Sequence, residues 1–317
     1  MPTLAGMALP TRLLGRTGIT VPTLGFGAAT FGGAYGRVDP QEAGQVVHAA
    51  IAAGMNLFDT SPYYGSGESE RLLGLCLRGV ARDRYVLATK VGRYGNQDFD
   101  FTADRVVRSV EESLARLGTD HLDIVQCHDI EFWPLQRIVD EALPALNGLK
   151  RSGKVRAIGI TGYPLGIFRT VLAQSAVDVV LSYCHHTLLD NTLATVVPWL
   201  DERGIGVFNA SPLAMGLLSS KGPPPWHPAP AEMKAACRAA VALCAQQGAD
   251  LGRVALHFAL TLPGVASTFV GIGTLAELQA NLAVVEQAPD PALLAAVQDL
   301  LAPWHNHVWR SGLDENN

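Results

Sequence analysis

The sequence has no uninterrupted apolar run of about 18 residues, so we expect no transmembrane helix. It is also poor in charge, with 17% charged residues, and basic residues are not in excess, because the net charge is −5. Such a chain is not expected to bind nucleic acid or an anionic membrane. The segment 1–15 has neither a basic start nor a long apolar stretch, so we expect no signal peptide.

The sequence also lacks the spacings that mark disulfide frameworks and metal sites. Its five cysteines are odd in number, and none belongs to a C-x-x-C pair. This pattern favours reduced thiols in a cytoplasmic protein. The histidines are not spaced as metal ligands, so we expect no metal.

What the sequence does contain is apolar material in alternating strand-like and helix-like segments. Hydrophobic residues make up 48% of the 317 residues, enough for a large core. Eight apolar runs have the length of strands; they begin or lie within residues 21–31, 56–61, 85–91, 122–128, 155–162, 177–184, 205–212 and 267–273. Helical periodicity or capping signals mark residues 39–54, 67–79, 102–118, 135–151, 165–173, 190–203, 231–247, 250–262 and 274–287.

This alternation predicts a closed (β/α)8 TIM barrel, with residues 1–317 as a single domain. The strands read as continuous apolar runs, which is typical of a parallel sheet buried on both faces. An open doubly wound sheet is the alternative, but residues 25–33, GFGAATFGG, do not match its G-x-G-x-x-G turn. Residues 11–21 are expected to form an N-terminal β-hairpin that closes the bottom of the barrel.

Four polar residues stand at or near the ends of three successive predicted strands. Asp59 ends one strand and Tyr64 follows it, while Lys90 and His128 end the next two. A barrel carries its active site at the carboxyl ends of its strands, so these side chains are expected at one mouth. An ammonium lowers the pKa of a nearby phenol, a carboxylate holds the ammonium, and an imidazole orients the reacting oxygen. The set predicts interconversion of a carbonyl and an alcohol with hydride transfer.

Each of these residues also has a structural interpretation. A charged residue at a strand end can be a cap or a salt-bridge partner, and His128 can be a satisfied core histidine. Tyr63, next to Tyr64, is expected to pack. The joint pattern on three neighbouring strands is what favours catalysis.

Several motifs extend this pattern over nearly the whole chain. They are NLFDTSPYYGSGESERLLG, YVLATKVG, LDIVQCHD, LKRSGKVRAIGIT and ASPLAMGLL. Through them the sequence resembles the aldo-keto reductases. The resemblance implies a nicotinamide cofactor across the barrel mouth and a catalytic role for the same four polar residues.

The resemblance also implies residues that bind the cofactor. They follow the fifth to eighth strands and are Thr161, Ser182, Ser211, Leu213, Gly216, Gly271, Gly273, Glu277 and Asn281. The family's glutamine after the sixth strand falls at or next to Ser182. The chain departs from the family pattern at Gly162, where an asparagine is usual, and at Ala210, where an aromatic residue stacks on the nicotinamide.

The last strand and helix predict NAD rather than NADP. No lysine or arginine lies between Thr268 and Val285, and the family's usual lysine and arginine positions hold Gly271 and Glu277. A carboxylate repels a 2′-phosphate but accepts a hydrogen bond from a ribose hydroxyl. Alternatively, Glu277 is a first-turn acid favoured by the helix dipole, and a basic residue from another loop binds the phosphate.

Within the family the sequence resembles the L-galactose dehydrogenases, through the motifs QCHDIEF, GPPPWHP and WRSGL. This implies oxidation of L-galactose at C1 to the lactone, as in ascorbate biosynthesis. Trp133, His185 and Trp226 are the expected sugar contacts, because aromatic rings stack on a pyranose and imidazoles read its hydroxyls. The alternatives are a dehydrogenase of L-fucose or D-arabinose, or a non-catalytic subunit that senses cofactor; either a monomer or a homodimer is compatible with the sequence.

Overall fold

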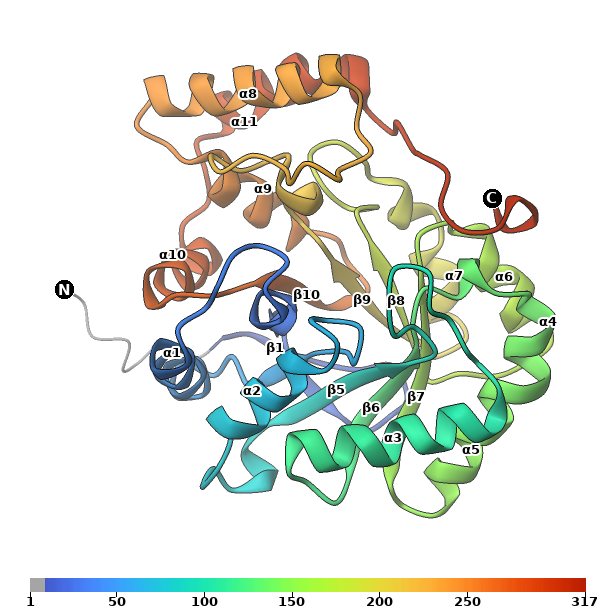
Figure 1. Cartoon of the computed structure of the whole chain (residues 1–317). Helices are drawn as coiled ribbons and strands as arrows, with labels where there is room; N and C mark the ends of the chain where they lie inside the picture. The colour runs from blue at the N-terminus through green and yellow to red at the C-terminus, as the bar shows by residue number, and fades with distance from the viewer. Residues whose placement is uncertain (1–8) are drawn as a thin grey trace.

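The computed structural model describes residues 9–317, and a closed barrel of eight parallel strands forms its centre (Figure 1). The strands neighbour one another in the order β10-β3-β4-β5-β6-β7-β8-β9. They are β3 Leu24–Gly27, β4 Leu57–Asp59, β5 Val86–Val91, β6 Leu122–Cys127, β7 Val155–Gly162, β8 Val179–Tyr183, β9 Gly206–Ala210 and β10 Val265–Gly271. The predicted barrel is confirmed, and the open sheet is excluded. Part of the signal-peptide prediction concerns residues 1–8, which lie outside the described residues.

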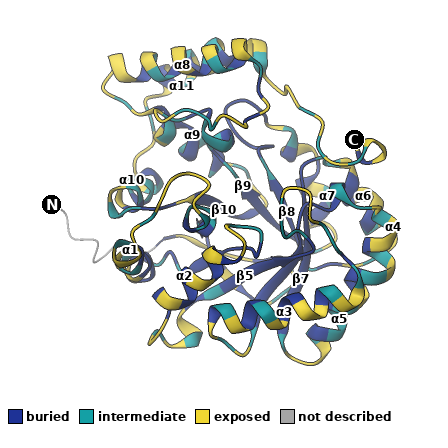
Figure 2. Cartoon of the chain, in the orientation of Figure 1, coloured by how far each residue is buried: buried dark blue, intermediate teal, exposed yellow. Residues whose placement is uncertain are grey.

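Helices cover the outside of the barrel, with exposed residues on their outer faces and buried residues in the strands (Figure 2). They include α1 Pro40–Ala52, α2 Glu68–Cys76, α3 Ala103–Leu117, α5 Leu143–Arg151, α6 Gly166–Leu172, α7 Val197–Asp201, α8 Ala231–Gln246, α9 Leu251–Ala259, α10 Leu275–Glu286 and α11 Pro291–Leu301. Asp39 caps α1 as expected, because its side chain accepts hydrogen bonds from the Gln41 and Glu42 amides.

Two predicted helices are interrupted near prolines. The helix expected at 135–151 contains a π-helical turn, Ile138–Ala142, directly before α5. Pro144 explains it, because proline has no N–H and its ring crowds the carbonyl four residues earlier. The helix expected at 190–203 is reduced to a 3-10 turn and the short α7, which has Pro198 in its first turn.

Helix α11 was not among the predicted helices. Asp290 caps it through the Ala292 amide, and Pro291 occupies its first turn. These are the same start signals that predicted α1. The structure places α11 beside α8 (Figure 1).

The N-terminal hairpin closes the bottom of the barrel, as predicted. Strands β1 Thr11–Leu13 and β2 Thr20–Pro22 pair antiparallel. The connecting residues Leu14 and Ile19 pack in one buried cluster with Leu57 and Ile124, which point into the barrel. The Arg16 amide donates a 2.9 Å hydrogen bond to the Gly204 carbonyl, which fixes the hairpin to the start of β9. The hairpin therefore does not cover the other end of the barrel, the mouth formed by the carboxyl ends of the strands.

No helix within residues 9–317 combines the length and apolarity needed to span a bilayer. The five cysteines are free and buried. Among the described residues, no group of three or more histidine, cysteine, aspartate or glutamate side chains could hold a metal ion.

Candidate active site

Lys90, near the end of β5, contacts Asp59 at the end of the neighbouring strand β4 and Tyr64 in the loop that follows β4. Its ammonium donates to Asp59 Oδ2 at 2.6 Å, to the Thr60 carbonyl at 2.9 Å and to the Tyr64 hydroxyl at 3.3 Å. Lys90 and Asp59 are 1% and 5% exposed, so their ion pair is shielded from water and salt. The structure therefore brings together the acid, amine and phenol that the sequence predicted.

The loop that carries Tyr64 is held by a close backbone contact. A side chain at Gly32 would meet the Tyr64 carbonyl carbon at 2.5 Å and the Gly65 amide nitrogen at 2.7 Å. Only glycine permits this approach. The loop after β3 thus packs directly on the turn that presents Tyr64 to Lys90.

Burial and neighbouring charges shift the pKa values of Lys90 and Tyr64 in opposite directions. Burial lowers the pKa of Lys90, but the adjacent Asp59 carboxylate raises it above its ordinary value, so the amine stays charged. Burial raises the pKa of Tyr64 to about 12, even though the Lys90 ammonium acts to lower it. The expected lowering by the ammonium is present, but in this structure burial outweighs it.

His128 stands over the same cluster as a neutral imidazole. Its ring centroid lies 5.6 Å from that of Tyr64, edge to face. Burial lowers the pKa of His128 to about 3. Ser61 Oγ lies 2.9 Å from Nδ1 and already accepts the Tyr63 amide. If the serine proton points to Nδ1, Nε2 carries the ring proton and becomes the donor.

Asp129 and Arg93 form a second buried ion pair beside His128, which the sequence did not reveal. Their carboxylate and guanidinium are in direct contact, and the guanidinium lies 4.0 Å from the Tyr63 ring centroid. The Thr161 hydroxyl accepts the Asp129 amide at 2.9 Å and donates to Asp129 Oδ1 at 3.2 Å. Thr161 therefore has only acceptor capacity left for another group.

The structure contradicts the placing of Ser182 in the cofactor site. Ser182 pairs in register with Gly162, whereas Leu181 pairs with Thr161. Leu181 belongs to the cluster inside the barrel, and side chains alternate along a strand. Leu181 therefore takes the inward position beside Thr161, and Ser182 points to the outer face.

The remaining predicted cofactor residues lie on two adjacent segments. Left-handed backbone conformations at Ser211 and Gly216 curl the loop after β9, a shape that suits an anion. Glu277 and Asn281 share one face of α10 because they are four residues apart. Lys221 of the β9–α8 loop donates to Glu277 Oε1 at 2.6 Å, which joins the two segments.

Glu277 helps to cap the start of α10, a role that the sequence analysis offered as an alternative. Its Oε2 accepts the Gly273 amide at 2.8 Å, and its own amide donates to Thr274 Oγ1 at 3.2 Å. Thr274 and Glu277 thus cap the start of α10. Burial would raise the pKa of Glu277, but the Lys221 contact and these amides lower it, so the side chain is ionised. The basic residue from another loop is therefore present, paired with the acid.

The three predicted sugar contacts lie in different surroundings. Trp226 is 56% exposed and lies edge to face with Tyr35, at 6.4 Å between centroids. His185 is buried, with Nδ1 on Asp190 and Thr192. Trp133 instead packs against Phe101 and Arg137, in the layer between strands and helices. Its role as a sugar contact stays a prediction.

Tyr35 was missed by the sequence analysis. Its side chain is 49% exposed, and its ring lies edge to face with that of Trp226. Its glycine-rich surroundings, FGGAYG, resemble an ordinary loop, and only the fold brings that loop to the mouth.

Glu131 binds the C-terminal segment to the barrel. Its Oε1 accepts from the Tyr163 amide, the Tyr183 hydroxyl and the Ser311 hydroxyl, at 3.2, 3.2 and 3.0 Å. Burial and the charge of Asp129 raise the pKa of Glu131 to about 8. The indole of Trp309 stacks on Tyr163 at 4.9 Å. The segment containing WRSGL thereby becomes part of the mouth.

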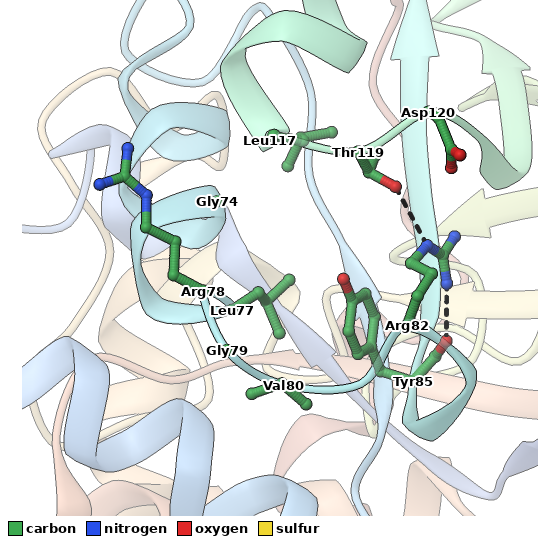
Figure 3. Close-up of a pocket in the computed structure, with 11 residues that line it drawn as sticks. Gly74, Leu77, Arg78, Gly79, Val80, Arg82, Tyr85, Leu117, Thr119 and Asp120 are labelled. Carbon is green, nitrogen blue, oxygen red and sulfur yellow. Dashed lines mark hydrogen bonds between the residues drawn. The ribbon is translucent and has the colours of Figure 1, made fainter.

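A hollow of about 370 Å³ lies at the opposite end of the barrel (Figure 3). Its lining includes residues that precede β5 and β6. Arg82 there donates to Thr119 and to the Tyr85 carbonyl, and pairs with Asp123. Because this guanidinium is committed to structural contacts, we assign no chemistry to the hollow.

A barrel whose carboxyl mouth holds a buried Asp–Lys–Tyr cluster beside a neutral histidine defines a (β/α)8 oxidoreductase. The Aldo/keto reductase family model matches residues 23–301. The chain therefore belongs to the Aldo/keto reductase family.

Named relatives and solved structures agree with this membership. The chain is 46% identical to L-galactose dehydrogenase of Arabidopsis thaliana, across 96% of this chain and 98% of that protein. It is 34% identical to D-arabinose 1-dehydrogenase of Saccharomyces cerevisiae, across 84% and 87%. An aldo-keto reductase from Bacillus halodurans, solved in its holo form, superposes with a TM-score of 0.76 at 25% identity and covers 96% of this chain and 99% of that one.

Proposed function

We propose that the chain is an aldose 1-dehydrogenase that oxidises L-galactose at C1 with NAD⁺. The observation that carries the proposal is the Lys90 ammonium held between Asp59 and Tyr64, at 2.6 and 3.3 Å. A phenol beside a charged ammonium is suited to exchange a proton with a sugar hydroxyl. Relatives named as dehydrogenases of L-galactose, D-arabinose and D-threo-aldoses support an aldose as substrate.

Tyr64 is the proposed acceptor of the anomeric hydroxyl proton. Its pKa of about 12, raised by burial, keeps most of the phenol protonated at neutral pH. Oxidation requires the phenolate, which the Lys90 ammonium stabilises, while Asp59 keeps that ammonium in place. The oxidised nicotinamide, when bound, accepts the hydride from C1. Sugar oxidation should therefore become faster as the pH rises.

His128 is the proposed group that holds the reacting oxygen. Because its pKa is lowered to about 3 by burial, it acts as a neutral donor and does not compete with Lys90 for negative charge. The Ser61 hydroxyl is hydrogen-bonded to Nδ1 of His128, which leaves Nε2 available to bind the reacting oxygen of the sugar. Positioning of this kind supplies much of the rate in such reactions.

The proposed cofactor site follows the two adjacent segments at the mouth. Thr161, with acceptor capacity left, suits the amide N–H of a carboxamide. The curled loop after β9 suits a pyrophosphate. The residues proposed to bind cofactor are Thr161, Ser211, Leu213, Gly216, Gly271, Gly273, Glu277 and Asn281.

The proposed preference for NAD⁺ depends on Glu277. Its ionised carboxylate lies at the start of α10, where a ribose hydroxyl could donate to it. Lys221 is already paired with that carboxylate at 2.6 Å, and so is not free to bind a 2′-phosphate. The pairing supports NAD⁺ as long as Glu277 is present.

Trp226 and His185 remain the proposed sugar contacts. The exposed indole of Trp226 can stack on the apolar face of a pyranose, and His185 Nε2 has no partner within residues 9–317. L-Fucose and D-arabinose are the second candidate substrates, supported by the resemblance to D-arabinose 1-dehydrogenase.

The test is formation of NADH or NADPH at 340 nm with L-galactose, L-fucose and D-arabinose, each with NAD⁺ and with NADP⁺. We expect the highest kcat/KM for L-galactose with NAD⁺. A higher value for another sugar would reassign the substrate. Cofactor binding without turnover of any aldose would contradict the proposed activity and favour a cofactor-sensing role.

A further inference from the structure

Asp129 is a buried carboxylate that the proposed proton chemistry does not use. It is the second residue after β6 and has a left-handed backbone with φ of 53°, a conformation uncommon outside glycine. The turn is held by two contacts of its side chain, with Arg93 and with the Thr161 hydroxyl. Strained residues of this kind concentrate at functional sites, so its position calls for an explanation.

The carboxylate lies beside the atom proposed to hold the reacting oxygen. Asp129 Oδ2 is 3.7 Å from His128 Nε2, which is too long for a hydrogen bond between them. Two neighbouring oxygens of a 1,2-diol, about one hydrogen-bond length apart, could bind one to each atom. The imidazole would take the oxygen on C1, and the carboxylate would take the hydroxyl on C2.

The carboxylate has the capacity and the charge for this contact. A carboxylate offers about four lone-pair sites, and Arg93 and the Thr161 hydroxyl use two of them. The Arg93 guanidinium and the Thr161 hydroxyl both donate to this carboxylate, which favours its charged form. Asp129 and His128 are 5% and 4% exposed, so a hydroxyl between them would be shielded from competing water.

We propose that Asp129 binds the C2 hydroxyl of the sugar and, with His128, selects substrates that carry a hydroxyl next to the reacting carbon. The inference rests on the proposed oxidation of an aldose at C1 and names the feature of the aldose that the site reads. It makes Asp129 a specificity-determining residue, distinct from the groups that move the proton.

The test compares two sugars that differ only at C2. L-Galactose and 2-deoxy-L-galactose are oxidised by the wild-type protein and by Asp129→Asn, and kcat/KM is measured for each pair. Hydrogen bonds to charged groups contribute about 1.5–3 kcal/mol, so the wild-type protein should favour L-galactose by about 10- to 150-fold. In Asp129→Asn this ratio should fall to a few-fold, chiefly through loss of L-galactose oxidation.

Asp123→Asn is the matched control. Asp123 lies near the other end of β6, is also buried, and pairs with Arg82 and Arg156. The control should keep the wild-type sugar ratio, whatever its effect on stability.

A purely structural role for Asp129 would lower kcat/KM for both sugars alike. An unchanged ratio in Asp129→Asn, with NADH binding intact by fluorescence, would therefore overturn the inference alone. If the wild-type protein binds NADH but oxidises neither sugar, the proposed function and this inference both fail. Asp129→Ala, which removes the acceptor entirely, should abolish the preference for L-galactose; retention of that preference would also overturn the inference.

Discussion

At the scale of single residues, the proposed chemistry depends on how burial and charge are balanced around Lys90. The ammonium is held by a carboxylate on the neighbouring strand and contacts the phenol of the following loop. The types and strand-end positions of Asp59, Tyr64, Lys90 and His128 were predictable from the sequence. The raised pKa of Tyr64 was not, because burial depends on side chains from distant segments.

Replacing Tyr64 by phenylalanine tests the proton acceptor. The ring packing is kept and only the hydroxyl is lost, so NADH binding should persist while kcat for L-galactose falls about 10²- to 10⁴-fold. For the wild-type protein, kcat should increase with pH through the alkaline range, because burial raises the pKa of Tyr64 to about 12. A Tyr64→Phe variant with the wild-type rate and pH profile would show that another group takes the proton.

Glu131 provides a prediction for stability. Burial raises its pKa from an ordinary 4.5 to about 8, so the folded state binds a proton more tightly than the unfolded chain. The free energy of unfolding should therefore decrease between about pH 4.5 and 8. Glu131→Gln keeps an acceptor for Tyr183 and Ser311 but does not titrate. Its Tm should match the wild type at pH 5 and exceed it at pH 9; equal Tm values at both pH values would contradict the shifted pKa.

At the scale of elements, most ends of helices and strands could be predicted from local sequence signals, and the exceptions also have local causes. The π-helical turn at Ile138–Ala142 comes from Pro144, and α11 was missed although Asp290 and Pro291 mark its start. The pairing of Lys221 with Glu277 had no local signal, because the two residues are 56 positions apart. The sequence also did not decide which face of its strand Ser182 occupies, because an alignment shift of one residue moves a side chain to the opposite face.

The start of α10 carries the prediction for cofactor choice. In Glu277→Gln the acid is neutralised and Lys221 becomes available to a 2′-phosphate, so kcat/KM should shift toward NADP⁺ by about tenfold, as for one charge-assisted contact. Adding Lys221→Met to this variant should reverse the gain with NADP⁺. If Glu277→Gln keeps the wild-type ratio of the two cofactors, the proposed source of NAD⁺ preference is wrong.

At the scale of the whole molecule, closure of the barrel brings the separate segments to one mouth. Alternating strand-like and helix-like segments were sufficient to predict the barrel, and the glycines of residues 11–21 were sufficient to predict its hairpin. They were not sufficient to predict how the C-terminal segment binds Glu131, because Ser311 and Glu131 are 180 positions apart and their contact requires the finished fold.

The hairpin should stabilise the barrel without touching the chemistry. Leu14 is fully buried among residues that point into the barrel, so Leu14→Ala should lower the free energy of unfolding by about 2–5 kcal/mol. Denaturant unfolding measures this change. Because the hairpin closes the end opposite the mouth, kcat/KM of the folded variant should remain close to wild type. A large loss of activity without loss of stability would contradict the division between the two ends.

The central claim is that the Lys90–Tyr64 pair performs sugar oxidation at the barrel mouth. The most direct test is the initial rate of NADH formation at 340 nm with L-galactose and NAD⁺, measured for the wild-type protein and for Tyr64→Phe. The account predicts clear turnover by the wild-type protein and a loss of about 10²-fold or more in the variant. Absence of turnover by a wild-type protein that binds NAD⁺, or equal rates in the two proteins, would contradict it.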